Sequence, residues 1–163
     1  MKVIYLGNPI LRKKAKEIEK FDEKLKKFAE ELAKVMYRDD GVGLAAPQVS
    51  ESIRMFVFDA GEGLNTVINP EILKRSEKKV KMEEGCLSIP GIYADVFRPE
   101  EVEVKYFDVT GNECRKVLTG YAARVFQHEF DHLDGILFID YLSTAKKAVL
   151  RSKLNKIKKG EIL

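Results

Sequence analysis

Hydrophobic periodicity changes twice along this chain of 163 residues, and these two changes constrain the fold most strongly. Apolar residues recur three and four positions apart over about 22–38, a spacing that predicts an amphipathic helix. Short runs rich in Val, Ile, Phe and Tyr follow, and a helical spacing returns at Gly120. The order of helix, several strands and further helices predicts an α+β fold.

The middle of the chain has the pattern of an antiparallel sheet. In 102–106 the apolar residues Val102, Val104 and Tyr106 alternate with charged residues, as in a sheet with one solvated face. The segment 108–112, which contains Gly111, predicts a hairpin turn. The runs predicted as strands are 53–59, 66–69, 80–83, 94–97, 102–108 and 114–119.

Two helices are predicted after the strands. The first begins at Gly120, ends near Asp134 and Gly135, and places Tyr121, Val125, Phe126 and Leu133 near one stripe. The second begins at Ser143 or Thr144 as N-cap and ends at Gly160, with an apolar face of Val149, Leu150, Leu154 and Ile157. Seven basic residues and one acid between 143 and 161 give this helix a basic outer face. Such a face is typical of a solvated helix surface or of contact with a polyanion such as RNA.

Composition fits one globular domain spanning 1–163. Hydrophobic residues make up 45% and charged residues 34%, which excludes a disordered or low-complexity chain. No apolar run is long enough to cross a membrane, and the first residues lead directly into a charged stretch, so we expect a cytoplasmic protein without a signal peptide. We expect the two cysteines, Cys86 and Cys114, to be reduced. No aromatic residue interrupts the basic tail, which argues against sequence-specific nucleic-acid binding.

The only two histidines occur together in the motif His128, Glu129, Phe130, Asp131, His132, which has the pattern H-E-x-x-H. Four helical residues rise about 6 Å, so both imidazoles leave the same helix face and can bind one metal ion. Glu129 lies beside them, where a carboxylate can act on a water molecule. A catalytic site of this kind needs a third protein ligand.

Candidates for that third ligand are few. The metzincin spacing would require a histidine at position 138, which is Phe138 here. The acids after His132 are Asp134, Asp140 and Glu161, which leaves open an endopeptidase that uses Asp140 or Glu161. Cysteine is the other suitable ligand type, and Cys86, within a Glu-Gly-Cys-Leu-Ser stretch, is favoured over Cys114 in a strand. A non-enzymatic metal or RNA-binding module built on the basic tail is a third alternative.

Three stretches together resemble the motifs of peptide deformylases, in the order and approximate spacing of that family. They are Gly-Val-Gly-Leu-Ala-Ala-Pro-Gln at 41–48, Glu-Gly-Cys-Leu-Ser at 84–88, and Gln-His-Glu-Phe-Asp-His at 127–132. Further likeness covers 8–12, 67–71 and 120–124, so the resemblance extends over nearly the whole chain and is to the compact bacterial type. It implies mostly antiparallel sheets packed around a central helix that carries H-E-x-x-H, with an N-terminal and a C-terminal helix.

The resemblance also implies an activity and a set of site residues. Family members remove the formyl group from the initiator methionine of nascent chains; a metal-bound hydroxide attacks the formyl carbon and formate is released. The resemblance implies Cys86, His128 and His132 as metal ligands, Glu129 as general acid and base, Gln48 with the Leu87 N–H as oxyanion donors, Val42, Gly43, Gly85 and Val125 in substrate binding, and Glu84 with Arg98 as supporting residues. Arg124 departs from some relatives, in which an apolar residue is found.

The ligand types suit several metals, and the resemblance implies Fe²⁺ as the usual ion, replaceable by Zn²⁺, Ni²⁺ or Co²⁺. Because the family's substrates emerge from the ribosome, the basic C-terminal helix is a candidate for ribosome contact. We expect no membrane partner.

Overall fold

The computed structural model of the chain describes residues 1–161. Within that range it has three α-helices and seven β-strands. The helices are α1 (Glu23–Arg38), α2 (Gly120–Leu133) and α3 (Thr144–Lys158), and short 3-10 helices span Pro9–Arg12, Ala46–Val49 and Phe138–Tyr141. The strands are β1 (Gly43–Ala45), β2 (Met55–Phe58), β3 (Asn65–Arg75), β4 (Lys79–Cys86), β5 (Ile89–Pro99), β6 (Glu101–Phe107) and β7 (Glu113–Thr119).

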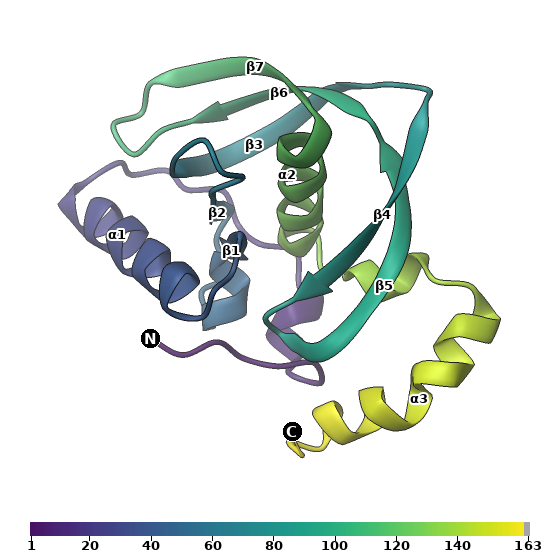
Figure 1. Cartoon of the computed structure of the whole chain (residues 1–163). Coiled ribbons are helices and arrows are strands. Elements are labelled where there is room, and N and C mark those ends of the chain that lie inside the picture. Colours follow the sequence, from purple (N-terminus) through teal and green to yellow (C-terminus); the bar gives the residue numbers. More distant parts are fainter. Residues whose placement is uncertain (162–163) are drawn as a thin grey trace.

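The strands form two antiparallel sheets. Five strands follow the order β1-β2-β3-β6-β7, and β4 and β5 form a separate hairpin between β3 and β6 in the chain. Figure 1 shows α2 between the five-stranded sheet and this hairpin. The structure therefore confirms the α+β prediction, with antiparallel sheets around the helix that carries H-E-x-x-H.

Both faces of the five-stranded sheet are covered near β2. Met55 and Val57 belong to the apolar cluster beneath α1, whereas Phe56 and Phe58 belong to the cluster beneath α2. The rings of Phe56 and Phe126 meet edge to face, with centroids 5.1 Å apart. Successive side chains of a strand point to opposite faces, so the continuous apolar run of β2 follows from having a helix on each side.

The third helix packs on the hairpin, away from the five-stranded sheet. Ser143 caps α3 by accepting a hydrogen bond from the Lys146 amide at 3.1 Å, as predicted. Leu150, Leu154 and Ile157 are buried in a cluster that includes residues of β5. The prediction that Val149 lies on the buried face of this helix was wrong. Val149 is 75% exposed, and the buried face is narrower, with only Leu150, Leu154 and Ile157.

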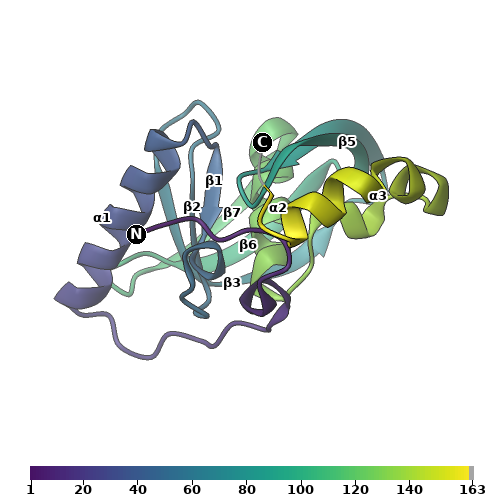
Figure 2. The same cartoon turned by 90° about the horizontal axis from the view of Figure 1, so that it is seen from below.

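The N-terminal segment connects the 3-10 helix after β1 with the turn after β4. Figure 2 shows it running between α1 and α3. The Ile4 amide donates to the Gln48 carbonyl at 2.7 Å, and the Leu6 amide donates to the Ser88 carbonyl at 2.9 Å. The 3-10 helix after β1 and the turn after β4 are therefore both hydrogen-bonded to the same N-terminal segment.

Most predicted elements are present, several with longer bounds. The hairpin turn forms, with the Gly111 amide donating to the Asp108 carbonyl at 3.0 Å. The strand predicted at 66–69 extends to Arg75, and the one at 94–97 covers Ile89–Pro99. The short strand β1 was not predicted. The placement of Tyr121 on the buried stripe was also wrong, because Tyr121 is 45% exposed at the first turn of α2. Among residues 1–161, no helix combines the length and the apolar character needed to cross a membrane.

Candidate metal centre and active site

Two elements bring three metal-binding side chains together. Helix α2 contributes His128 and His132, whose ring centroids are 5.2 Å apart, and the end of β4 contributes Cys86. One ligand atom from each of these residues lies within 4.8 Å of the other two. Cys86 Sγ is 3.4 Å from His132 Nε2. One thiolate and two imidazoles at this spacing fit a single divalent transition-metal ion with a coordination position left for water or substrate.

Glu84 orients the first histidine. Its Oε1 is 2.8 Å from His128 Nδ1, so the other ring nitrogen, Nε2, is free to face the cluster. Arg98 donates two hydrogen bonds to the Glu84 carboxylate, at 2.6 and 3.0 Å, and Arg124 donates a third at 2.7 Å. The structure therefore brings Glu84 and Arg98 together directly behind His128. Arg124, which the sequence did not assign to this group, also bonds to Glu84.

Burial and charge set the protonation states in the metal-free protein. Burial alone would raise the pKa of Glu84, but hydrogen bonds from His128 and Arg98 lower it well below its usual range. Burial and the neighbouring His128 lower the pKa of His132 well below its usual range, so this ring is neutral, as a ligand must be. Burial raises the pKa of Glu129 to about 7. A carboxyl with this pKa can both accept and return a proton near neutral pH.

Glu129 faces the cluster and lies against β1. Its Oε2 is 3.8 Å from His128 Nε2, and its Oε1 is buried without a hydrogen-bond partner among the described residues. A Cβ atom on Gly43 would lie 2.6 Å from Glu129 Oε2, so only glycine permits this approach. The unpaired oxygen is consistent with a group that binds a water molecule or substrate.

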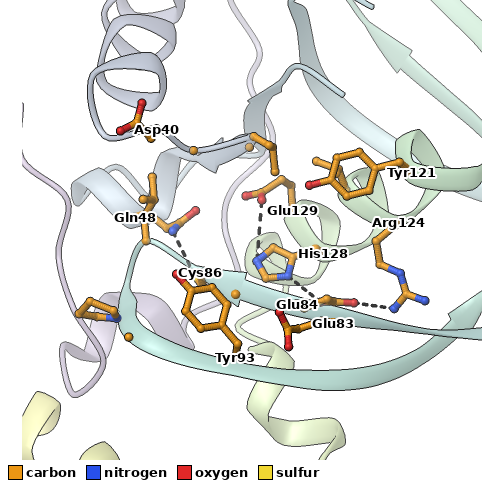
Figure 3. A pocket seen from close by; sticks show the side chains of 18 residues that line it. Asp40, Gln48, Glu83, Glu84, Cys86, Tyr93, Tyr121, Arg124, His128 and Glu129 are labelled. Carbon is orange, nitrogen blue, oxygen red and sulfur yellow. Dashed lines mark hydrogen bonds and ion pairs between the residues drawn. The ribbon is translucent and has the colours of Figure 1, made fainter. Parts of the chain in front are cut away.

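Gln48 reaches the cluster from the 3-10 helix Ala46–Val49, which follows β1. Its Oε1 accepts a hydrogen bond from the Ala45 amide at 2.9 Å, which fixes the side-chain amide. Its Nε2 donates to Ser88 Oγ at 3.0 Å and lies 3.5 Å from Cys86 Sγ. Leu87, in the turn between β4 and β5, borders the same space. The amide donor of Gln48 therefore points toward the metal-binding cluster (Figure 3).

One cavity of about 430 Å³ is lined by Gln48, Cys86, Leu87, His128 and Glu129. All the residues predicted from the sequence for substrate binding, Val42, Gly43, Gly85 and Val125, lie in its wall. Arg98 and His132 are not part of the wall, because they lie behind Glu84 and deeper in the core. The cavity thus joins the metal-binding cluster to a wall of small and apolar residues.

Sequence reasoning missed several residues of the cavity wall, among them Tyr93 and Asp40. The Tyr93 ring lies over Gly85, where a Cβ atom would come within 2.5 Å of it. Cross-strand contacts of this kind depend on the register of β4 and β5, which the sequence did not give. Gly85 and Tyr93 both lay just outside the predicted strands 80–83 and 94–97, so the sequence carried no signal for this contact.

The other candidate ligands lie elsewhere. Asp140 forms an ion pair with Arg12, with two hydrogen bonds of 2.7 and 3.0 Å, and Asp134 pairs with Arg54 at 3.0 Å. Cys114 is in β7 and packs against the core beside the five-stranded sheet. The geometry therefore favours Cys86 over the acids that an H-E-x-x-H endopeptidase would need.

Comparison with known proteins agrees with this geometry. The sequence profile of the polypeptide deformylase family matches residues 1–148. The chain belongs to the peptide deformylase family. Peptide deformylase from Thermotoga maritima is 54% identical over 148 residues, which cover 91% of this chain and 90% of the relative. Peptide deformylase from Thermotoga neapolitana is 51% identical over 159 residues, covering 98% and 97%.

Solved deformylase structures share the fold. A crystal structure of peptide deformylase from Plasmodium falciparum superposes with a TM-score of 0.94 at 41% identity, covering 98% of this chain and 96% of that one. The Thermotoga maritima deformylase structure superposes with a TM-score of 0.86 at 52% identity, covering 87% of this chain and 97% of that one. Deformylases are metal-dependent hydrolases, and membership in the family confirms the predicted fold class and enzyme class.

Proposed function

We propose that this enzyme hydrolyses the N-formyl group from the initiator formyl-methionine of nascent polypeptides and releases formate. The observation that carries the proposal is the convergence of Cys86, His128 and His132 within 4.8 Å beside the buried carboxylate of Glu129. We also propose that residues 1–163 act as one catalytic domain, since α3 shares its buried cluster with β5 of the site hairpin. We propose the cytoplasm as its compartment.

Cys86, His128 and His132 would hold one divalent ion, with Fe²⁺ as the physiological choice and Zn²⁺, Ni²⁺ or Co²⁺ as substitutes. When bound, such an ion would lower the pKa of water toward neutrality and so would supply the nucleophile for the formyl carbon. Glu84 would support this ion indirectly by fixing the tautomer and the ring orientation of His128, and Arg98 would hold Glu84.

Glu129 is the proposed general base and acid. It accepts a proton from the attacking water and gives a proton to the amine nitrogen as the C–N bond breaks, so that formate and a free amino terminus result. Its burial and its pKa near neutrality suit both steps. Gly43 supports this role by leaving room for the carboxylate against β1.

Gln48 and the backbone N–H of Leu87 are the proposed donors to the oxyanion that forms on the formyl oxygen. The Ala45 amide fixes the orientation of the Gln48 side chain, and the Nε2 hydrogen that faces Cys86 Sγ would be the one donated to the oxyanion. Loss of one such donor costs about 2.7–4 kcal/mol of barrier in other enzymes.

The peptide itself would lie along the cavity wall. Strand β1 is an edge strand of the five-stranded sheet and borders the cavity at Gly43, so an extended peptide can pair with it as an added strand. Val42, Val125 and the ring of His128 would contact the methionine side chain, and Gly85 allows close approach of the backbone from the opposite wall.

Formate release from a formyl-Met-Ala-Ser peptide tests the proposal, with enzyme loaded anaerobically with Fe²⁺. Glu129→Gln should lower kcat by at least about 100-fold while metal content stays near one ion per chain, because the carboxylate is not a ligand. Gln48→Leu should lower kcat about 100-fold or more with the same metal content. Unchanged release from the Glu129 variant would reject the assigned mechanism, and no release from fully loaded wild-type enzyme would reject the function.

We further propose that the basic outer face of α3 contacts the ribosome. All seven basic side chains of residues 146–159 are exposed, while Leu150, Leu154 and Ile157 pack inward on the hairpin. This separation leaves positive charge free for phosphate. Lys147→Glu with Arg151→Glu should weaken co-sedimentation with ribosomes, whereas Lys26→Glu with Lys27→Glu on α1 should not. Equal binding by all variants would exclude the contact.

A further inference from the structure

We infer that Arg124 is a positioning residue that holds the two halves of the proposed metal centre in place relative to each other. The inference rests on the proposed metal centre. The histidines come from α2 and the cysteine from the β4-β5 hairpin, so the cluster depends on how the helix and the hairpin are joined. Figure 3 shows the Arg124 side chain extending from α2 toward Glu84 on the hairpin.

One guanidinium group reaches both strands of the hairpin. Arg124 Nη1 donates to Glu84 Oε2 at 2.7 Å and to the Val96 carbonyl of β5 at 2.8 Å. Its Nη2 donates to the Val80 carbonyl of β4 at 2.7 Å. The residue is only 3% exposed, so these hydrogen bonds are shielded from water, which strengthens them.

Arg124 and His128 share the same acceptor from adjacent turns of the helix. They are four residues apart, hence on one face of α2, and both bond to Glu84, one at each carboxylate oxygen. Two contacts one helical turn apart fix the Glu84 carboxylate relative to α2, and Arg98 fixes it relative to β5. Without Arg124, the carboxylate keeps its contacts with Arg98 but loses one of its two contacts with α2, so the His128 ring is held less firmly.

Glu84 and Cys86 lie on the same strand, two residues apart. A shift of β4 relative to α2 therefore changes the direction of the Glu84 carboxylate and the distance from Cys86 Sγ to His132 Nε2 together. Because Arg124 bonds to carbonyls of both strands, it resists such a shift. Its predicted effect is thus on metal affinity and ligand geometry.

Arg54 provides a matched control. It is also a buried arginine, 9% exposed, and its Nη1 contacts two backbone carbonyls, of Ala15 and Leu133, and one carboxylate, of Asp134. None of these groups belongs to the metal-binding cluster. Replacement of Arg54 therefore removes a similar set of hydrogen bonds without touching Glu84.

The test measures Co²⁺ affinity of the metal-free protein by chelator competition, together with the thiolate-to-cobalt and d–d absorption bands. Arg124→Met should weaken Co²⁺ binding by about 10–100-fold and shift the bands, as loss of other supporting contacts to metal ligands does. Arg124→Lys, which keeps the charge and can refill one contact, should recover part of the affinity and carries the test if the methionine variant does not fold. Arg54→Met should leave the bands and the affinity nearly unchanged.

Wild-type affinity and bands in both Arg124 variants would overturn the inference. Equal weakening by Arg54→Met would also overturn it, because the effect would then be general destabilisation. A wild-type protein that binds no Co²⁺ would instead reject the proposed metal centre itself, which distinguishes the two failures.

Discussion

At the scale of single residues, Gly43 is where the smallest chemical change should disturb the site most. A methyl group there would lie 2.6 Å from Glu129 Oε2 and 2.8 Å from Glu129 Cγ, so either the carboxylate or β1 must move. Gly43→Ala should lower kcat/KM about 100-fold, the effect of a displacement of about 1 Å at a reacting group. Metal content should not change, because Glu129 is not one of the three proposed ligands.

Gly41→Ala is the comparison for this prediction. Its added methyl would meet the tip of the Leu87 side chain at 2.7 Å, and a flexible side chain can move aside. The loss of kcat/KM should therefore be smaller than for Gly43→Ala, and equal losses would argue against a special role for the Gly43 contact with Glu129.

Glu84 should make the stability of the metal-free protein depend on pH. Its folded pKa lies below its ordinary value of 4.5, so the unfolded chain binds the proton more readily than the folded chain does. The stabilisation is therefore present above about pH 4.5 and is lost as the pH falls toward the folded pKa. Glu84→Gln should lower the free energy of unfolding by about 3–5 kcal/mol at pH 7 and flatten this acid dependence.

Urea denaturation of the metal-free proteins between pH 3 and pH 7 measures this effect, with the exposed Glu62→Gln as control. The control should follow the wild-type curve. A Glu84 variant with the wild-type acid dependence would show that another carboxylate is responsible.

At the scale of elements, the N-cap of α3 offers a direct test of helix stability. Ser143 accepts a hydrogen bond from the Lys146 amide, and Ser143→Ala should cost about 1 kcal/mol of the free energy of unfolding. Ser152→Ala, in the exposed middle of the same helix, should be neutral or slightly stabilising because alanine has the higher helix propensity. Urea denaturation compares them, and equal effects would contradict the capping role.

Elements with strong periodicity could be predicted from the sequence, and those defined by tertiary contacts could not. Helix α1 and strand β6 have clear patterns of burial, and the structure places them within a few residues of the predicted bounds. Strand β1 has only three residues, Gly43 to Ala45, with little β propensity, and exists because β2 pairs with it. The H-E-x-x-H spacing predicted that both histidines lie on one helix face, because that depends only on helix geometry. The contacts of Arg124 could not be predicted, because they depend on where the β4-β5 hairpin packs against α2.

At the scale of the whole molecule, metal should stabilise the fold. The proposed ligands come from α2 and β4, which are distant in the chain, so the site exists only in the folded state. Free metal at 1,000 times its Kd would stabilise the protein by about 4 kcal/mol, or roughly 10 °C in Tm for a domain of this size. Chelation should lower the Tm of wild-type protein by this amount and leave the Tm of Cys86→Ala nearly unchanged. A chelator effect of the same size in both would place the ion elsewhere.

The measurement that tests the account most directly is formate release from formyl-Met-Ala-Ser with metal content determined on the same samples, for wild type, Cys86→Ala and Cys114→Ala. The account predicts about one ion per chain and rapid release for wild type and for the Cys114 variant, because Cys114 lies in β7 outside the cluster. It predicts that both properties are lost together in the Cys86 variant. Full metal content and normal release from Cys86→Ala would contradict the assignment of Cys86, His128 and His132 as the catalytic metal site.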